Sequence, residues 1–103
     1  ALGTDHPDVG DSYNNMAGVY KKQGKYEEAL SYYSKALDIR LKALGTDHPD
    51  VGATYNNMAI LYKNQGDKGK AKDFFEKALR IRKEKLGDDH PHTKSVQQSL
   101  NNL

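Results

Sequence analysis

The first ten residues read ALGTDHPDVG, and the same ten letters return unchanged at residues 43–52. The offset of 42 holds beyond this block, because residues 1–42 and 43–84 agree at 25 positions. LGDDHP at residues 86–91 begins a third unit, which runs to Leu103. A fixed period of this length predicts a repeat architecture in which stacked units share a continuous core. We therefore expect one domain over 1–103, with repeats at 1–42 and 43–84 and a terminal half-repeat or capping helix at 85–103.

The composition excludes several classes of protein. The 103 residues carry a net charge of +2, contain no cysteine and are 36% hydrophobic. Their mean hydropathy of -0.92 leaves no run of about 20 apolar residues that could span a membrane. Without cysteine there is no disulfide scaffold and no thiolate metal site, and a reducing compartment is favoured, so we expect a cytoplasmic location. The small net charge gives no general sign of nucleic-acid binding.

Each unit has the apolar spacing of two helices. In the first half of unit one, apolar side chains recur at intervals of three and four, and the second half follows the same rule. Gly24 ends the first stripe and Gly45 ends the second, as is typical of helix C-termini. Connections this short make neighbouring helices antiparallel. We expect helices at 7–23, 26–44, 49–65, 68–86 and 91–102.

The apolar and small residues of each unit resemble the signature of the tetratricopeptide repeat. Unit one carries it as Tyr13, Met16, Ala17, Tyr20, Gly24, Tyr26, Ala29, Tyr33, Ala36 and Leu37. Unit two carries it as Tyr55, Met58, Ala59, Tyr62, Gly66, Ala71, Phe75, Ala78 and Leu79. The 42-residue period is longer than the usual 34 and is similar to that of kinesin light chain repeats. The resemblance implies an all-α fold of antiparallel helical hairpins stacked as a right-handed α-solenoid, and a role in binding proteins.

Unit two departs from unit one at the start of its second helix. Lys68-Gly69-Lys70 stands where unit one has Tyr26-Glu27-Glu28. Lysine and glycine lack the aromatic ring of Tyr26, and glycine is a poor helix former. We therefore expect the second helix of unit two to start later or to fray.

A histidine precedes a proline in every unit, at His6, His48 and His90, and His92 follows the third proline. Histidine and aspartate are metal ligands, but a helix start explains the proline and the aspartates together. In that interpretation an Asp such as Asp5 caps the helix and negative charge complements its dipole. We expect no metal and no cofactor at these positions.

Basic side chains gather in the second helices, where residues 63–85 hold nine basic and four acidic side chains. Arg40, Arg82, Lys83 and Lys85 lie near helix C-termini, which cations stabilise, so we expect a solvated face. RNA binding through these helices is kept as a minor alternative. The sequence has no Gly-rich phosphate loop, no nucleophile motif and no paired carboxylates beside a histidine, so we expect no enzyme.

A stripe of mostly polar residues runs along the first helix of each unit. In the tetratricopeptide repeat family, which the sequence resembles, such helices line a concave groove. We expect this groove to bind an extended or short helical peptide segment of another protein. The alternative is a structural or self-associating spacer without a groove ligand, and we also expect weak end-to-end self-association. The expected groove residues are Asp11, Asn14, Lys21, Asn56, Ile60, Lys63 and Gln98.

Overall fold

The computed structural model describes residues 6–103, apart from the side chain of Pro7, and every regular element in that part is an α-helix. The all-α prediction is confirmed, and each predicted helix is present with its ends within one residue of the expected positions. None of these helices is long and apolar enough to cross a membrane. The helices are α1 (Pro7–Lys22), α2 (Tyr26–Leu44), α3 (Pro49–Asn64), α4 (Lys68–Leu86) and α5 (Pro91–Asn101).

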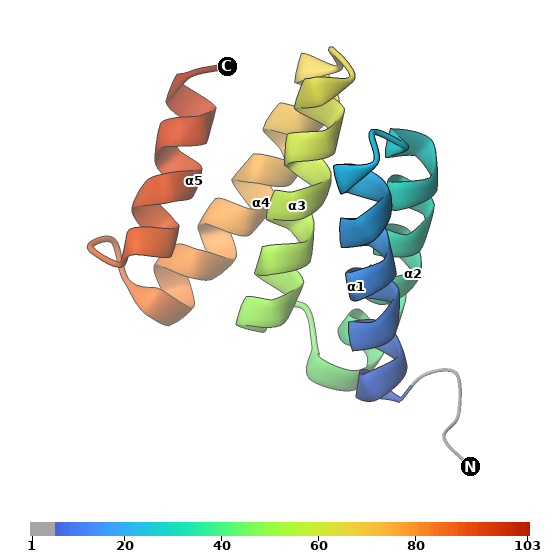
Figure 1. Ribbon diagram of the computed structural model, residues 1–103. Helices are drawn as coiled ribbons and strands as arrows, with labels where there is room; N and C mark the ends of the chain where they lie inside the picture. The colour runs from blue at the N-terminus through green and yellow to red at the C-terminus, as the bar shows by residue number, and fades with distance from the viewer. Residues whose placement is uncertain (1–5) are drawn as a thin grey trace.

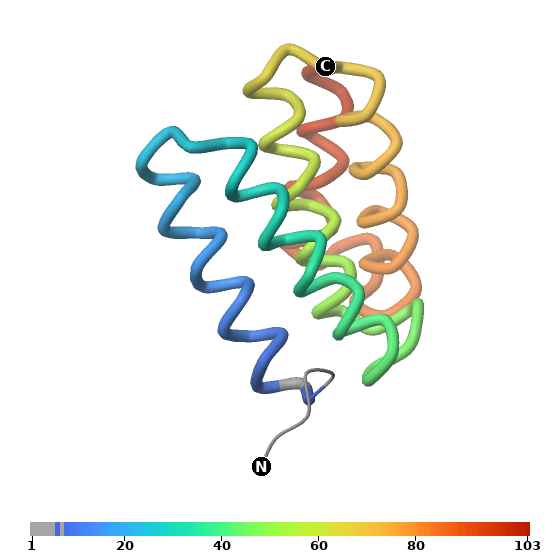
Figure 2. Tube along the Cα trace, turned by 90° about the vertical axis from the view of Figure 1, so that its right-hand side faces the viewer, coloured from blue at the N-terminus to red at the C-terminus, as the bar shows by residue number. Residues whose placement is uncertain are grey.

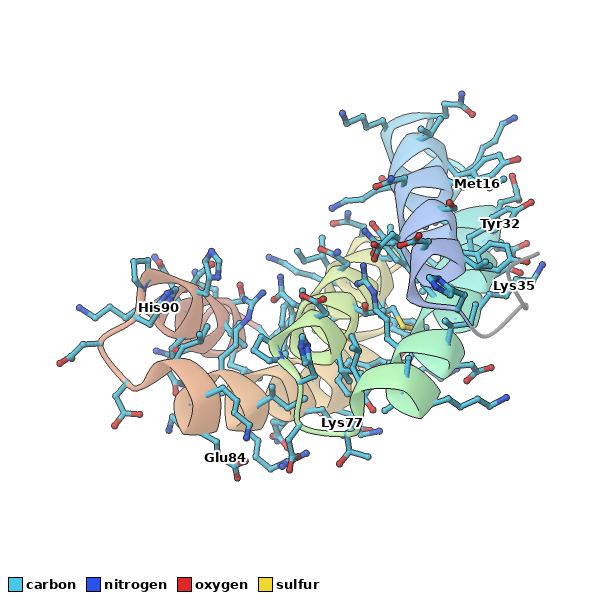
Figure 3. The ribbon with its side chains drawn as sticks, turned by 90° about the horizontal axis from the view of Figure 1, so that it is seen from below. Met16, Tyr32, Lys35, Lys77, Glu84 and His90 are labelled. Atoms are coloured by element: carbon cyan, nitrogen blue, oxygen red, sulfur yellow. The ribbon has the colours of Figure 1, made fainter. Side chains whose placement is uncertain are left out.

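The helices stack as a solenoid of antiparallel hairpins. α1 packs on α2 and α3 packs on α4, while α2 also contacts α3 and α4 also contacts α5 (Figure 1). The view turned by 90° shows α1 and α2 running in opposite directions as one hairpin (Figure 2). Seen from below, the chain forms an arc whose inner side is bordered by α1, α3 and α5 (Figure 3). The first helices of the units, α1, α3 and α5, therefore face the concave side, whereas the second helices, α2 and α4, do not border it.

Two apolar clusters hold the stack together. Each cluster joins one hairpin to the first helix of the next, so its members come from three consecutive helices. Fully buried alanines let the helix backbones approach closely, and one aromatic ring fills the space between them. The first cluster is Ala17, Ala29, Tyr33, Met58 and Leu61, and the second is Ala59, Ala71, Phe75, Ala78 and Val96.

Three helices begin with a histidine cap, which corrects the expectation that Asp caps them. The Nδ1 atoms of His6, His48 and His90 accept the backbone N–H two residues ahead at 3.1, 3.0 and 3.1 Å. Proline follows each histidine in the first helical turn, where its missing N–H leaves no bond unmade. Asp5 lies outside the described residues, and Asp47 accepts a hydrogen bond from Arg80 Nη1 at 3.1 Å instead.

Removing one of these caps should lower stability measurably. We expect His48→Ala to lower the free energy of unfolding by about 0.5–2 kcal/mol, because the amide of Asp50 loses its acceptor. His48→Asn offers a different side-chain acceptor at the same position and should restore most of the loss. Urea unfolding followed by circular dichroism measures both variants. A His48→Ala variant as stable as the parent chain would show that the imidazole contributes nothing at this position.

The second helix of unit two does not start late, contrary to the expectation from Lys68-Gly69-Lys70. α4 begins at Lys68, the position equivalent to Tyr26 in α2. The side chain of Asp67 caps it by accepting the backbone N–H of Lys70 at 3.1 Å, whereas Lys25 gives α2 no side-chain cap. Gly66 precedes the cap with a φ of +85°, a conformation that glycine adopts without strain. A local hydrogen bond therefore defines the helix start where the aromatic side chain is missing.

Candidate functional site

The concave side is bordered by α1, α3 and α5 (Figure 3). The seven expected groove residues all fall within the bounds of these helices. On α1 the members Asp11, Asn14 and Lys21 are spaced by three and then seven residues, so they share one helical face. The side chains differ in how accessible they are to a ligand. Asp11, Lys63 and Gln98 are exposed, whereas Asn14, Lys21, Asn56 and Ile60 are half-buried.

Asp11 is already engaged within the chain. Its Oδ1 accepts a hydrogen bond from Arg40 Nη2 at 3.0 Å, and the two groups form an ion pair. Arg40 Nη1 also donates to the hydroxyl of Thr54 at 2.8 Å and to the backbone carbonyl of Asp50 at 3.3 Å. One guanidinium of α2 thus links α1 to α3, and Asp11 helps to hold the groove together.

The expectation that Arg40 and Arg82 are solvated is wrong. Their exposed fractions are only 8% and 9%, and both lie between helices, whereas Lys83 and Lys85 are exposed as expected. Arg82 Nη1 donates to the backbone carbonyl of His92 at 3.3 Å, and burial lowers the pKa of its guanidinium. The signal was present in the sequence, because Arg40 follows Tyr33 by seven residues and Ala36 by four on the buried stripe of α2.

Asn14 of α1 and Asn56 of α3 occupy equivalent repeat positions but have different surroundings. Asn14 places its Oδ1 in the interior, and no donor within residues 6–103 reaches it. A buried acceptor left unpaired costs about 1–3 kcal/mol of stability. Asn56 is partly buried at the equivalent position of α3, and Ile60 one turn later packs against the second apolar cluster. The floor of the groove therefore mixes amide groups with apolar surface.

Other kinds of site find little support in the described chain. Within residues 6–103, no three histidine or acidic side chains gather as a metal site. The exposed Arg80 is paired with Asp47 at 3.1 Å and with Glu84 at 3.7 Å. Because Arg40 and Arg82 are buried as well, the second helices present fewer free cations than their composition indicates, which weakens the case for RNA binding.

Comparisons with known proteins agree with this architecture. A family model described as tetratricopeptide repeat matches residues 8–84, well over half of the chain. Among solved structures, the fold is similar to BtubC (BKLC) from P. vanneervenii, with a TM-score of 0.87 at 23% identity over 94% of this chain and 39% of that one.

A second similar structure is a putative kinesin light chain from Podosopora anserina with nearly identical repeats, with a TM-score of 0.89 at 25% identity over 99% of this chain. A variant form of that protein gives a TM-score of 0.79 at 26% identity over 98% of this chain. This chain spans 48% of the length of either form. No curated protein matches the sequence.

Proposed function

Since the chain belongs to the tetratricopeptide repeat family, we propose that it binds another protein by holding an extended or short helical segment against α1, α3 and α5. Tetratricopeptide repeats generally mediate protein–protein interactions, and proteins built from them are typically scaffolds without enzymatic activity. The observation that carries the proposal is the recurrence of an asparagine, at Asn14 and Asn56, on successive helices of the concave side.

The spacing of the asparagines suits an extended peptide. Packed helices lie about 8–10 Å apart, and an extended chain advances about 3.3 Å per residue. An amide from each first helix would then meet the peptide backbone at roughly every third residue. Lys21 and Lys63 lie seven residues beyond Asn14 and Asn56 on the same faces, where they can pair with carboxylates of the bound segment. The proposed ligand is therefore a segment with accessible backbone and some acidic side chains.

A peptide array probed with the chain supplies the ligand for the test, and the peptide that binds most tightly is then titrated in solution. We expect Asn56→Ala to weaken its binding about tenfold, equivalent to roughly 1.4 kcal/mol, because one backbone hydrogen bond is lost. Helical content measured by circular dichroism should stay unchanged.

The matched control is Ser34→Ala, which removes an exposed polar group from α2, away from the first helices. This variant should bind the peptide as the parent chain does. An Asn56→Ala variant with undiminished affinity would contradict the groove, and equal losses in both variants would point to binding outside it.

A self-associating spacer is the second candidate, and exposed apolar side chains on α1 favour it. Met16 and Val19 are 41% and 54% exposed, although they are large hydrophobic residues. Met16 is labelled on α1 in Figure 3. A second copy that covered them would remove this surface from water, which drives association. Sedimentation velocity over a hundredfold range of concentration distinguishes the two candidates, because only the spacer needs copies that associate.

A further inference from the structure

Arg40 and Arg82 occupy equivalent positions in α2 and α4 but have unequal partners. Arg40 is neutralised by the carboxylate of Asp11 and donates further hydrogen bonds to α3. Arg82 is buried to the same degree, yet within residues 6–103 its guanidinium donates only to the neutral carbonyl of His92. A buried cation without a counter-charge is costly, so the surroundings of Arg82 are electrostatically incomplete.

Two substitutions between the units explain the difference. Ala53 stands where unit one has Asp11, which removes the carboxylate that pairs with the guanidinium. Val96 replaces Thr54, which removes a hydroxyl acceptor. His92 stands where Asp50 does, and the backbone carbonyl at this position accepts from the arginine in both units. Both side chains that accept hydrogen bonds from Arg40 are thus missing near Arg82.

The space left by these changes is open to solvent. Ala53, Arg82, His90 and His92 line a hollow of about 300 Å³ between the starts of α3 and α5 and the end of α4. The imidazoles of His90 and His92 lie with their ring centroids 4.9 Å apart, and His90 marks the start of α5 in Figure 3. Asp50 is the acidic residue of this lining, and its carboxylate lies 3.9 Å from His48 Nδ1, with no ion pair to Arg82.

The geometry points to a carboxylate-binding site at Arg82, in which an acidic side chain of the bound protein segment takes the place that Asp11 holds beside Arg40. A guanidinium binds carboxylates through charge-assisted hydrogen bonds, and a site with low exposure strengthens them. The source of the carboxylate rests on the proposed function, because the partner's segment brings it to the concave side. The binding chemistry itself needs no partner and can be tested separately.

The first test introduces a carboxylate into the site by a substitution in the chain itself. Ala53→Asp places a carboxylate at the position equivalent to Asp11, and we expect its melting temperature to rise above that of Ala53→Asn, the neutral control of the same shape. The melting temperatures of both variants are compared in chloride at constant ionic strength. An Ala53→Asp variant no more stable than Ala53→Asn would show that Arg82 does not accept a carboxylate there.

The second test observes the guanidinium directly. The chain has three arginines, so their side-chain Nε–Hε signals can be resolved by NMR and assigned by substitution. Sodium acetate at constant ionic strength should shift the Arg82 signal saturably and leave the Arg40 signal in place, because Asp11 already pairs with Arg40. An acetylated and amidated Gly-Gly-Asp-Gly-Gly peptide should act likewise, and its Asn counterpart should not. Inorganic phosphate, titrated in parallel, shows whether the site prefers a carboxylate.

Ala53→Asp should weaken acetate binding at least tenfold. An Arg82 signal that acetate moves no more than chloride does, or that moves equally in Ala53→Asp, would overturn the site. A shift with phosphate alone would overturn the assignment to a carboxylate. Neither result depends on Asn56, so a failure of the groove and a failure of this site remain distinguishable.

Discussion

Phe75→Ala should lower the free energy of unfolding by about 3–5 kcal/mol, the typical cost of removing a fully buried ring. The ring is 1% exposed at the centre of the second cluster, where Ala71, Ala78 and Val96 surround it. Small neighbours cannot expand into the space that the ring leaves, so most of the cavity should persist. A chain of this size is stable by about 5–15 kcal/mol, so the variant should lose a large part of its stability.

Phe74→Ala is the matched control, because it deletes the same ring one position earlier. Phe74 is partly buried and stacks on Tyr55 and Tyr62, with centroid distances of 5.8 and 5.3 Å. Its loss removes contacts but leaves an opening to solvent in place of a closed cavity, so we expect a smaller effect. Urea unfolding of both variants measures the difference. If Phe74→Ala were the more damaging change, the packing of α4 would be rotated from the arrangement described above.

The helices could be predicted because several independent signals agree along the sequence. Apolar spacing, the prolines after the histidines and the glycines at the turns all put the boundaries at the same places. The exact repetition of residues 1–10 at 43–52 then transfers each boundary from one unit to the next. Signals within each short segment suffice here, because the apolar stripe of each helix determines which of its faces packs against the neighbouring helices.

The helix caps could not be predicted correctly, because sequence alone gives two adjacent candidates. Asp47 and His48 both precede Pro49, and aspartate is the more usual cap. The backbone is extended at His48, with a φ of -73° and a ψ of 140°, and this geometry aims the imidazole at the free amide of Asp50. The residue that caps is thus selected by its position at the boundary.

The burial of Arg40 and Arg82 was missed because their charge indicated a position in solvent. Arg40 and Arg82 lie near helix C-termini, where a solvated cation is stabilised, and this argument competed with their place on the apolar stripe. The apolar stripe gives the correct location, because Asp11, Thr54 and a backbone carbonyl accept hydrogen bonds from both terminal nitrogens of Arg40 inside the stack. Its buried Nε has no partner within residues 6–103. The accepting groups come from other helices, up to 29 residues away in the chain, so local reasoning does not reveal them.

The sequence placed the groove residues on the correct helices, but it did not show which of them hold the fold together and which are free to bind a ligand. Periodicity put Asp11 and Asn56 on the same polar stripe, yet the structure ties Asp11 to Arg40 in an ion pair, which the neutral amide of Asn56 cannot form. Ile60 belongs to the stripe as well and still contributes to the core. Whether a stripe residue is free to bind a ligand depends on the helix packed behind it, which the helical period does not describe.

That dependence on neighbours can be measured at one repeat position, because Leu61 and Val19 are equivalent residues of α3 and α1. Leu61 is fully buried in the first cluster, since α2 covers this face of α3. Val19 is 54% exposed, because no helix within residues 6–103 covers the same face of α1. Leu61→Ala should therefore lower the free energy of unfolding by about 2–5 kcal/mol, and Val19→Ala by less than about 0.5 kcal/mol.

The comparison must be made at several protein concentrations, because association could bury Val19. At low micromolar concentration the two variants should differ as stated. If Val19→Ala became costly only at high concentration, a second copy would be covering Val19, and the spacer candidate would gain support. If it were costly at every concentration, α1 would be covered within the single chain, and its exposed edge would not exist in solution. The cost of deleting an apolar side chain here measures whether a neighbouring helix is present, because the repeat position itself is the same in both units.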